Sequence, residues 1–235
     1  MHRDHIAFLR LQQLADSALP IGAAAHSFGL ETLVSEGLLH VEQLEVFLRD
    51  YLEETGTLEC LYCLHGHRLA AQIDSPEVLT AKWLDLNAQL SAWKTARESR
   101  LASAALGRRF LQIAHGLEID AQLLELTRAA KAAGIETHYP IAFGLVSGIL
   151  KIPVTMAGLA YLQQALSGLV SACQRLMPLG QNRASQILWS LKPAILSAIQ
   201  RSEEAALDDE AFTFTPLVEI GSMRHPALTT RLFIS

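Results

Sequence analysis

Charged residues are scarce in this chain. They make up 18% of its 235 residues, whereas hydrophobic residues make up 50%, and the mean hydropathy is +0.23. Such a composition excludes an intrinsically disordered chain, because disorder requires low hydrophobicity and high charge. It also provides more apolar surface than a monomer of this size usually buries. We therefore expect part of that surface to lie in subunit interfaces.

The chain also lacks an excess of basic residues. It carries 19 Lys and Arg against 24 Asp and Glu, which gives a net charge of −5 and a pI of about 6.0. A protein that binds along nucleic acid needs a basic surface to neutralise phosphates, so we expect no nucleic-acid partner. Only three cysteines occur, and the first ten residues contain no apolar stretch typical of a secretory signal. We therefore expect a cytoplasmic protein.

No hydrophobic run is long enough to cross a membrane without interruption. Residues 141–162 come closest, but Lys151 and Pro153 lie in the middle of this stretch. A lysine at the centre of a bilayer costs about 2.5–3.5 kcal/mol, and a proline breaks the helix. The sequence therefore predicts two buried helices that meet at residues 151–153, and no membrane partner.

Apolar residues recur at helical spacing along almost the whole chain, and strand patterns are nearly absent. Ser75 and Pro76 form a typical helix start, Asp120 forms another, and Gly134 is placed to end the second of these helices. Only residues 212–215 alternate with a period of two, and four residues without a partner do not make a sheet. The sequence predicts an all-α, single-domain bundle of about eight to ten helices. The clearest helices are expected near residues 41–53, 76–93, 94–113, 120–131 and 185–200, the last kinked at Pro193.

The composition changes sharply near the C-terminus. Residues 203–210 contain five carboxylates, and the segment after them ends in a basic, apolar sequence. We predict a helical domain over residues 1–202, followed in the same domain by an acidic hinge and a C-terminal tail over 203–235. The tail is expected to be mobile until a partner binds it. Pro226 should keep His225 extended and start any tail helix at or after itself. A last element docked on its own domain is the alternative.

Cysteine and histidine cluster at residues 60–67, which raises the question of a metal site. On a helix, Cys60, Cys63 and His67 share one face, but Cys60 and His67 would lie about 10.5 Å apart along the axis. One ion cannot bind both. We therefore predict that this cluster packs in the core and binds no metal.

Signatures of enzymes are missing. No nucleophile elbow surrounds Ser17 or Ser27, and Asp16 and the serines suit helix capping better than hydrolysis. The chain contains no GxGxxG or GK[ST] phosphate loop and no ExxH repeat, so we expect neither nucleotide hydrolysis nor a di-metal centre. The residues alone therefore predict a helical interaction protein that is not an enzyme and holds no cofactor.

Three separated stretches resemble the UreF-type urease accessory proteins. Residues 14–22 with 26–31 resemble their N-terminal signature, residues 176–181 after the basic Arg175 resemble their PLGQ motif, and residues 222–225 with 230–235 resemble their C-terminal ending. Order and spacing agree over essentially the whole chain. Three positions depart from the family pattern. Pro226 stands where Glu is usual, Glu219 where Asp is common, and Ile234 where Arg is frequent.

The resemblance implies an all-helical homodimer that is not itself an enzyme. Such proteins bridge the UreD (or UreH) scaffold and the UreG GTPase and regulate GTP-dependent nickel delivery to apo-urease. Glu31 and Arg175 are the implied candidates for coupling nucleotide state to nickel release. The implied partner-binding residues are His26, Glu31, Arg175, Pro178, Gly180, Gln181, Ser222, Met223, Arg224, His225, Arg231, Leu232 and Phe233.

Two other functions remain open on the sequence. A helical-bundle enzyme of haem-oxygenase-like architecture would have a similar composition, with His115 or His138 as a cofactor ligand. A chaperone-like binding module without any connection to urease is the second alternative.

Overall fold

The protein is all-α, as predicted. The computed structural model describes residues 2–117, 119–208, 213 and 215–235, and within these ranges it contains no strand. The number of helices in these ranges is slightly higher than the expected eight to ten. They are α1 (His2–Leu14), α2 (Leu30–Ser35), α3 (Leu44–Tyr51), α4 (Thr57–Leu69), α5 (Pro76–Trp93), α6 (Arg97–Gly116), α7 (Gln122–Ala133), α8 (Tyr139–Ile149), α9 (Val154–Leu176), α10 (Gln181–Ser190), α11 (Lys192–Asp208) and α12 (Pro216–Arg224). Short helical turns include η1 (Ala23–Ala25), η3 (Leu52–Gly56) and η5 (His225–Ala227).

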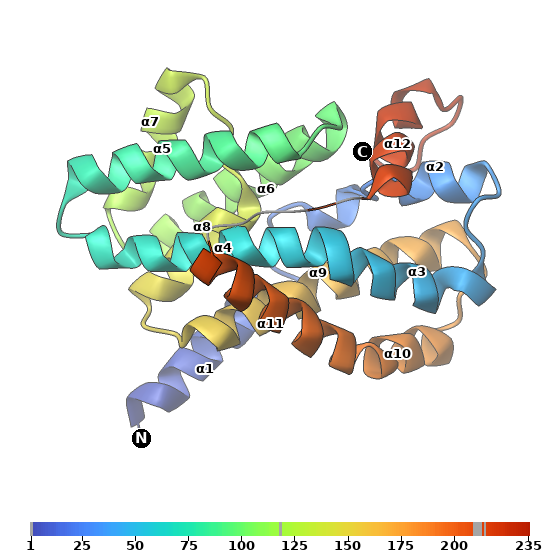
Figure 1. Ribbon diagram of the computed structural model, residues 1–235, viewed down its shortest axis with the longest axis horizontal. Helices are drawn as coiled ribbons and strands as arrows, with labels where there is room; N and C mark the ends of the chain where they lie inside the picture. The colour runs from blue at the N-terminus through green and yellow to red at the C-terminus, as the bar shows by residue number, and fades with distance from the viewer. Residues whose placement is uncertain (1, 118, 209–212, 214) are drawn as a thin grey trace.

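Helix α4 runs through the middle of the molecule and packs against α8 (Figure 1). Residues 139–147 of α8 are all buried, as are most residues of α4. The two helices approach closely because Gly66 and Gly144 lie at their crossing, where a Cβ on either would overlap the backbone of the other helix. Helices that are buried on most sides need apolar residues around most of their circumference. The burial of α4 and α8 within one chain therefore accounts for part of the high mean hydropathy, without a subunit interface.

The apolar stretch 141–162 forms two helices, as the sequence predicted. Helix α8 ends at Ile149 and α9 begins at Val154, with Pro153 as its N-cap residue. Lys151 adopts a left-handed conformation, with φ of 59°, in the turn between them. In the ranges that the structure describes, no helix combines the length and hydropathy needed to cross a membrane.

Two predicted helix boundaries differ from the structure. The helix expected from residue 94 begins at Arg97, because the buried Lys94 leaves the helical path and pairs with Glu59. The helix expected over 185–200 is divided into α10 and α11 at Leu191 instead of being kinked. Pro193 is the second residue of α11, where its missing N–H is not needed.

The C-terminal region also differs from expectation. Helix α11 continues to Asp208, past residue 202, where the helical domain was expected to give way to the acidic hinge. That boundary stays a prediction. The rest of the acidic run and part of the period-two segment 212–215 fall on residues outside the described ranges. The tail helix α12 begins before Pro226, and His225 is helical, with φ of −53° and ψ of −40°, so both expectations about Pro226 were wrong. The first turn of η5 tolerates this proline.

His138 is enclosed in a polar network at the start of α8. Its Nδ1 lies 3.1 Å from the Ser103 hydroxyl and its Nε2 lies 2.8 Å from the Ser91 hydroxyl, so neither nitrogen is placed to bind a cofactor. Burial, together with the charges of Lys94 and Arg100, lowers the pKa of His138 to about 3. The imidazole is therefore neutral at physiological pH.

We expect His138 to make the protein less stable in mild acid. An unfolded histidine takes up a proton near pH 6.5 while folded His138 does not, so protonation favours the unfolded state as the pH falls below that value. Between pH 7 and pH 5 this difference lowers the free energy of unfolding by about 2 kcal/mol. Urea denaturation at both pH values should show a smaller loss for His138→Gln than for the wild type. An equal loss in the two proteins would contradict this assignment.

Candidate functional site

The N-terminal motif forms a bent segment that leads into α2. Gly22 and Gly29 both have positive φ angles, which turn the chain before η1 and before α2. The Arg175 guanidinium, at the end of α9, donates to the carbonyl of Ala24 at 2.6 Å. Arg175, the residue before the central motif, is therefore in direct contact with the segment that joins the two parts of the N-terminal motif.

The C-terminal tail is docked on this segment. The amide of Ile234 donates to the carbonyl of Ala25 at 2.9 Å, and the amide of Ser27 donates to the carbonyl of Ser235 at 2.5 Å. The ring of His26 forms a further hydrogen bond with the Ser235 hydroxyl at 2.8 Å. The expectation of a mobile tail is therefore wrong for this structure. Paired backbone groups hold the tail, and the acidic run before it does not prevent docking.

Glu31 is buried at the centre of this contact. One carboxylate oxygen accepts from the amide of Leu232 at 2.5 Å, and the other accepts from the amide of Phe233 at 3.0 Å and from His225 Nε2 at 2.8 Å. Burial alone would raise the pKa of Glu31, but these donors outweigh it and hold the pKa below the ordinary glutamate value. Glu31 is therefore ionised and bound to the tail.

Arg175 contacts the tail as well. Its guanidinium lies 4.1 Å from the centroid of the Phe233 ring, and Phe233 is 5% exposed. A cation over an aromatic face at this distance is attracted to the ring. All three motifs identified in the sequence thus meet at one place, beside the C-terminus in Figure 1.

The sequence did not single out three residues that hold this region together. Glu98, in the first turn of α6, lies 2.6 Å from His225 Nδ1, and Ser235 pairs with the N-terminal motif. Glu219 accepts from the amide of Ala96 at 2.7 Å and so joins α12 to the start of α6. Glu219 was noted only as a departure from the family pattern. No local signal marks Glu98, because its partner is remote in the chain.

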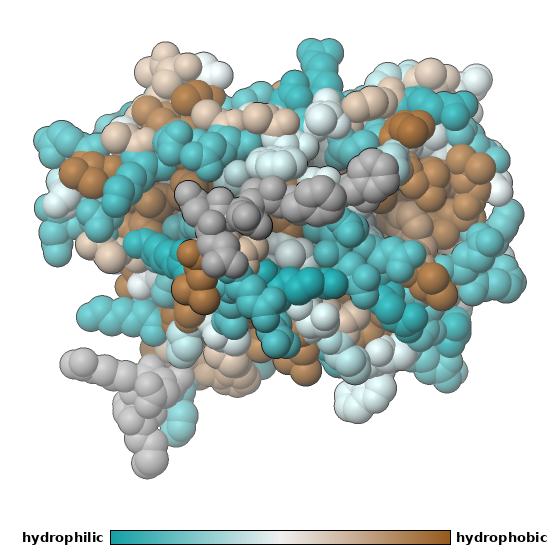
Figure 2. Space-filling model, in the orientation of Figure 1, coloured by the Kyte–Doolittle hydropathy of each residue, from teal (hydrophilic) through white to brown (hydrophobic). Residues whose placement is uncertain are grey.

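The remaining predicted site residues lie on the surface, except for the buried Ser222. Pro178, Gly180 and Gln181 are exposed between α9 and α10. Arg224 pairs with Glu36 at 2.9 Å, and Arg231 lies 3.5 Å from Glu98. An apolar surface, which we call the α12–tail surface, is formed by Leu217, Ile220, Met223, Leu232 and Ile234, each between 43% and 69% exposed. Figure 2 shows hydrophobic residues gathered on the side of the molecule where α2 and α12 lie.

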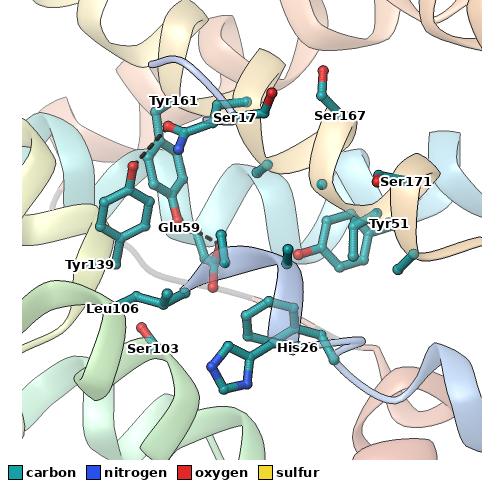
Figure 3. A pocket seen from close by; sticks show the side chains of 18 of the residues that line it. Ser17, His26, Tyr51, Glu59, Ser103, Leu106, Tyr139, Tyr161, Ser167 and Ser171 are labelled. Atoms are coloured by element: carbon teal, nitrogen blue, oxygen red, sulfur yellow. Dashed lines mark hydrogen bonds between the residues drawn. The ribbon is translucent and has the colours of Figure 1, made fainter. Parts of the chain in front are cut away.

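A cavity of about 290 Å³ lies beside the N-terminal motif. His26 and Arg175 contribute to its wall, and Figure 3 shows Tyr139, Tyr161 and Glu59 facing it from the core helices. Tyr161 donates to Glu59 at 2.8 Å, and the other oxygen of Glu59 pairs with Lys94. The carboxylate at this cavity is thus neutralised by the protein itself.

The cysteine cluster is part of the core. Cys60 and Cys63 have no exposed surface, and burial raises the pKa of Cys60 to about 12, so the thiol stays protonated. His67 donates from Nε2 to the carbonyl of Ile152 at 2.7 Å. The described part of the chain holds no group of three or more His, Cys, Asp or Glu residues arranged to bind a metal. The predicted packing in the core is therefore confirmed for Cys60 and Cys63, and the absence of a bound metal stays a prediction.

We expect Gly29→Ala to displace α12. Gly29 has φ of +88°, and a Cβ on it would lie 2.7 Å from the carbonyl oxygen of Val218 and 2.8 Å from the amide nitrogen of Ser222. Gly22 has a similar φ of +90° but open space around it, so Gly22→Ala adds only backbone strain of about 1–2 kcal/mol. Thermal melting and trypsin cleavage after Arg224 should both show a larger effect of Gly29→Ala. Equal effects would contradict the close contact between α2 and α12.

Comparisons with known proteins agree with the resemblance seen in the sequence. The sequence model of the UreF family matches residues 39–192. The urease accessory protein UreF of Arthrobacter sp. (strain FB24) is 34% identical over 235 residues, which cover 97% of this chain and 96% of that protein. UreF proteins from a Nostoc species and from Lachnoclostridium phytofermentans are 35% and 32% identical, each over 97% of this chain and over 96% and 98% of their own lengths. The chain therefore belongs to the UreF family of urease accessory proteins.

Proposed function

We propose that this chain is a nickel-insertion chaperone for urease. In this proposal it bridges the UreD (UreH) scaffold and the UreG GTPase, acts as a cytoplasmic homodimer, and regulates GTP-dependent delivery of nickel to apo-urease. The observation that carries the proposal is the contact among the three motifs, in which Glu31, Arg175 and the tail hold one another. A surface built from remote segments suits a protein that relays the binding of one partner to another.

The two partners would use different exposed parts of this region. We assign the α12–tail surface to the scaffold, because its apolar side chains have the exposure expected of residues that bury area in an interface. We assign Pro178, Gly180 and Gln181 to the GTPase, because they are exposed next to Arg175. Arg175 touches both the N-terminal motif and Phe233, so it would connect the two surfaces.

The chain is proposed to have no catalytic activity of its own. Its sequence contains no phosphate loop, which supports a regulator of the GTPase rather than a second GTPase. Nickel is the cargo in this proposal, and no residue is assigned to bind it. The haem-oxygenase-like alternative loses support because both nitrogens of His138 are bonded to serines and the family is one of accessory proteins.

A pull-down tests this function. The chain would be presented to UreD, UreG and apo-urease with and without GTP and nickel, and we expect a complex that contains all of them. Gln181→Ala should weaken capture of UreG at least tenfold, whereas Gln186→Ala, also exposed on α10, should not. Failure of the wild-type chain to capture either UreD or UreG would refute the proposal. Equal effects of the two glutamine variants would refute only the assigned GTPase surface.

A further inference from the structure

His225 lies between two carboxylates that come from different helices. Its side chain has no exposed surface. Nε2 is 2.8 Å from a Glu31 oxygen on α2, and Nδ1 is 2.6 Å from a Glu98 oxygen on α6. A single ring thus connects three elements that are remote in the sequence.

When both carboxylates are ionised, both ring nitrogens carry protons in this arrangement. Glu31 is ionised, so it can only accept a hydrogen bond from Nε2. The other oxygen of Glu98 accepts from Arg231 at 3.5 Å, so an ionised Glu98 offers one oxygen to each of these two partners. A neutral ring would turn a lone pair toward one of the two carboxylates. The positively charged imidazolium donates to both.

With both carboxylates ionised, the imidazolium balances the charges around the ring. Glu31 and Glu98 contribute two negative charges, and His225 and Arg231 contribute two positive charges. The neighbouring Arg224 is paired with Glu36, which follows α2, and leaves this balance unchanged. Without Glu98, Glu31 alone could accept from a neutral ring, and Arg231 would lose its carboxylate partner.

We infer that Glu98 is a positioning residue that keeps His225 in its doubly protonated form and thereby holds the C-terminal tail on the N-terminal motif. Its effect reaches the tail through Arg231 directly and through Glu31, which binds the amides of Leu232 and Phe233. The inference depends on the proposed function only for the role of the docked tail in partner binding. Its test uses the isolated chain and no partner.

Nitrogen NMR of the histidine rings tests the protonation state. The chain would be labelled with ¹⁵N at its nine histidines, and the signals of His225 would be assigned by their loss in His225→Gln. At pH 7 we expect the imidazolium pattern for His225 in the wild type. Glu98→Gln should convert it to a neutral ring with the proton on Nε2, and Glu98→Asp should keep the imidazolium.

Trypsin cleavage after Arg231 tests the hold on the tail. Cleavage of Glu98→Gln should be at least threefold faster than that of the wild type. Glu77→Gln is the matched control, because Glu77 is also the second residue of a helix and stabilises it through the helix dipole. This control should match the wild type in both measurements.

Three results would overturn the inference. They are a neutral His225 in the wild type, an imidazolium that persists in Glu98→Gln, and cleavage of Glu98→Gln at the wild-type rate. If Glu98→Gln does not fold, the wild-type spectrum still decides the protonation state of His225. In that case, a Glu98→Asp variant with a neutral His225 ring that is cleaved at the wild-type rate would overturn the inference. Loss of partner capture in the pull-down would bear on the proposed function alone.

Discussion

Replacing Glu31 by alanine is expected to release the C-terminal tail and to reduce urease activation at least tenfold. The substitution leaves the amides of Leu232 and Phe233 and the ring of His225 without their acceptor in a buried site. Each unsatisfied buried group costs about 1–3 kcal/mol. The tail can avoid these costs by moving into water. The helical core should stay folded, because Phe233 is the one tail residue in its buried apolar cluster within the described ranges.

Two measurements check this expectation. Trypsin should cleave Glu31→Ala after Arg231 much faster than the wild type, and the far-UV circular dichroism should change little. Activation would be measured with apo-urease, UreD, UreG, nickel and GTP. Glu36→Ala is the matched control, because Glu36 follows the same helix and pairs with Arg224. Activation of urease by Glu31→Ala at the wild-type rate would show that the docked tail is not needed.

Replacing Gly144 by alanine is expected to cause a large loss of stability. The new Cβ would lie 1.9 Å from the carbonyl oxygen of Cys63 and 2.8 Å from the amide nitrogen of His67. These are backbone atoms of α4, so the central helices α4 and α8 must move apart. Overpacking of this kind costs about 3 kcal/mol, which corresponds to a fall of about 6–12 °C in Tm for a chain of this size.

The control for this variant is an exposed glycine in another helix. Gly168 lies in α9, and a Cβ added there would meet no atom within 4 Å. Because alanine favours helix more than glycine does, Gly168→Ala should raise the free energy of unfolding by about 0.5–1 kcal/mol. Thermal melts of the two variants should therefore shift in opposite directions. A Gly144→Ala protein that melts like the wild type would contradict the close packing of α4 and α8.

The sequence predicted many of the local features correctly. Pro76 starts a helix, Asp120 binds the amide of Gln122, and Gly134 ends α7 in a left-handed conformation. Such features depend on a few neighbouring residues, whose steric and hydrogen-bonding preferences act over one helical turn. The division of the apolar stretch at Pro153 followed from the same local reasoning.

The errors arose where a remote contact decides the conformation. The start of α6 moved to Arg97 because Lys94 turns inward to Glu59, a residue of another helix. Pro226 did not keep His225 extended, because the His225 ring is held between Glu31 and Glu98. Neither the composition of the acidic run nor that of the tail shows that backbone partners are available at residues 25–27.

The sequence by itself determined that this protein is all-α, where several of its helices start and end, and which three motifs relate it to the UreF family. Periodicity, capping residues and motif order are local or linear properties, so they can be found along the chain. Only the tertiary structure decided that the motifs touch. Glu31 and His225 are 194 residues apart, and their contact exists because α2, α6 and α12 pack together and exclude water from the charges between them.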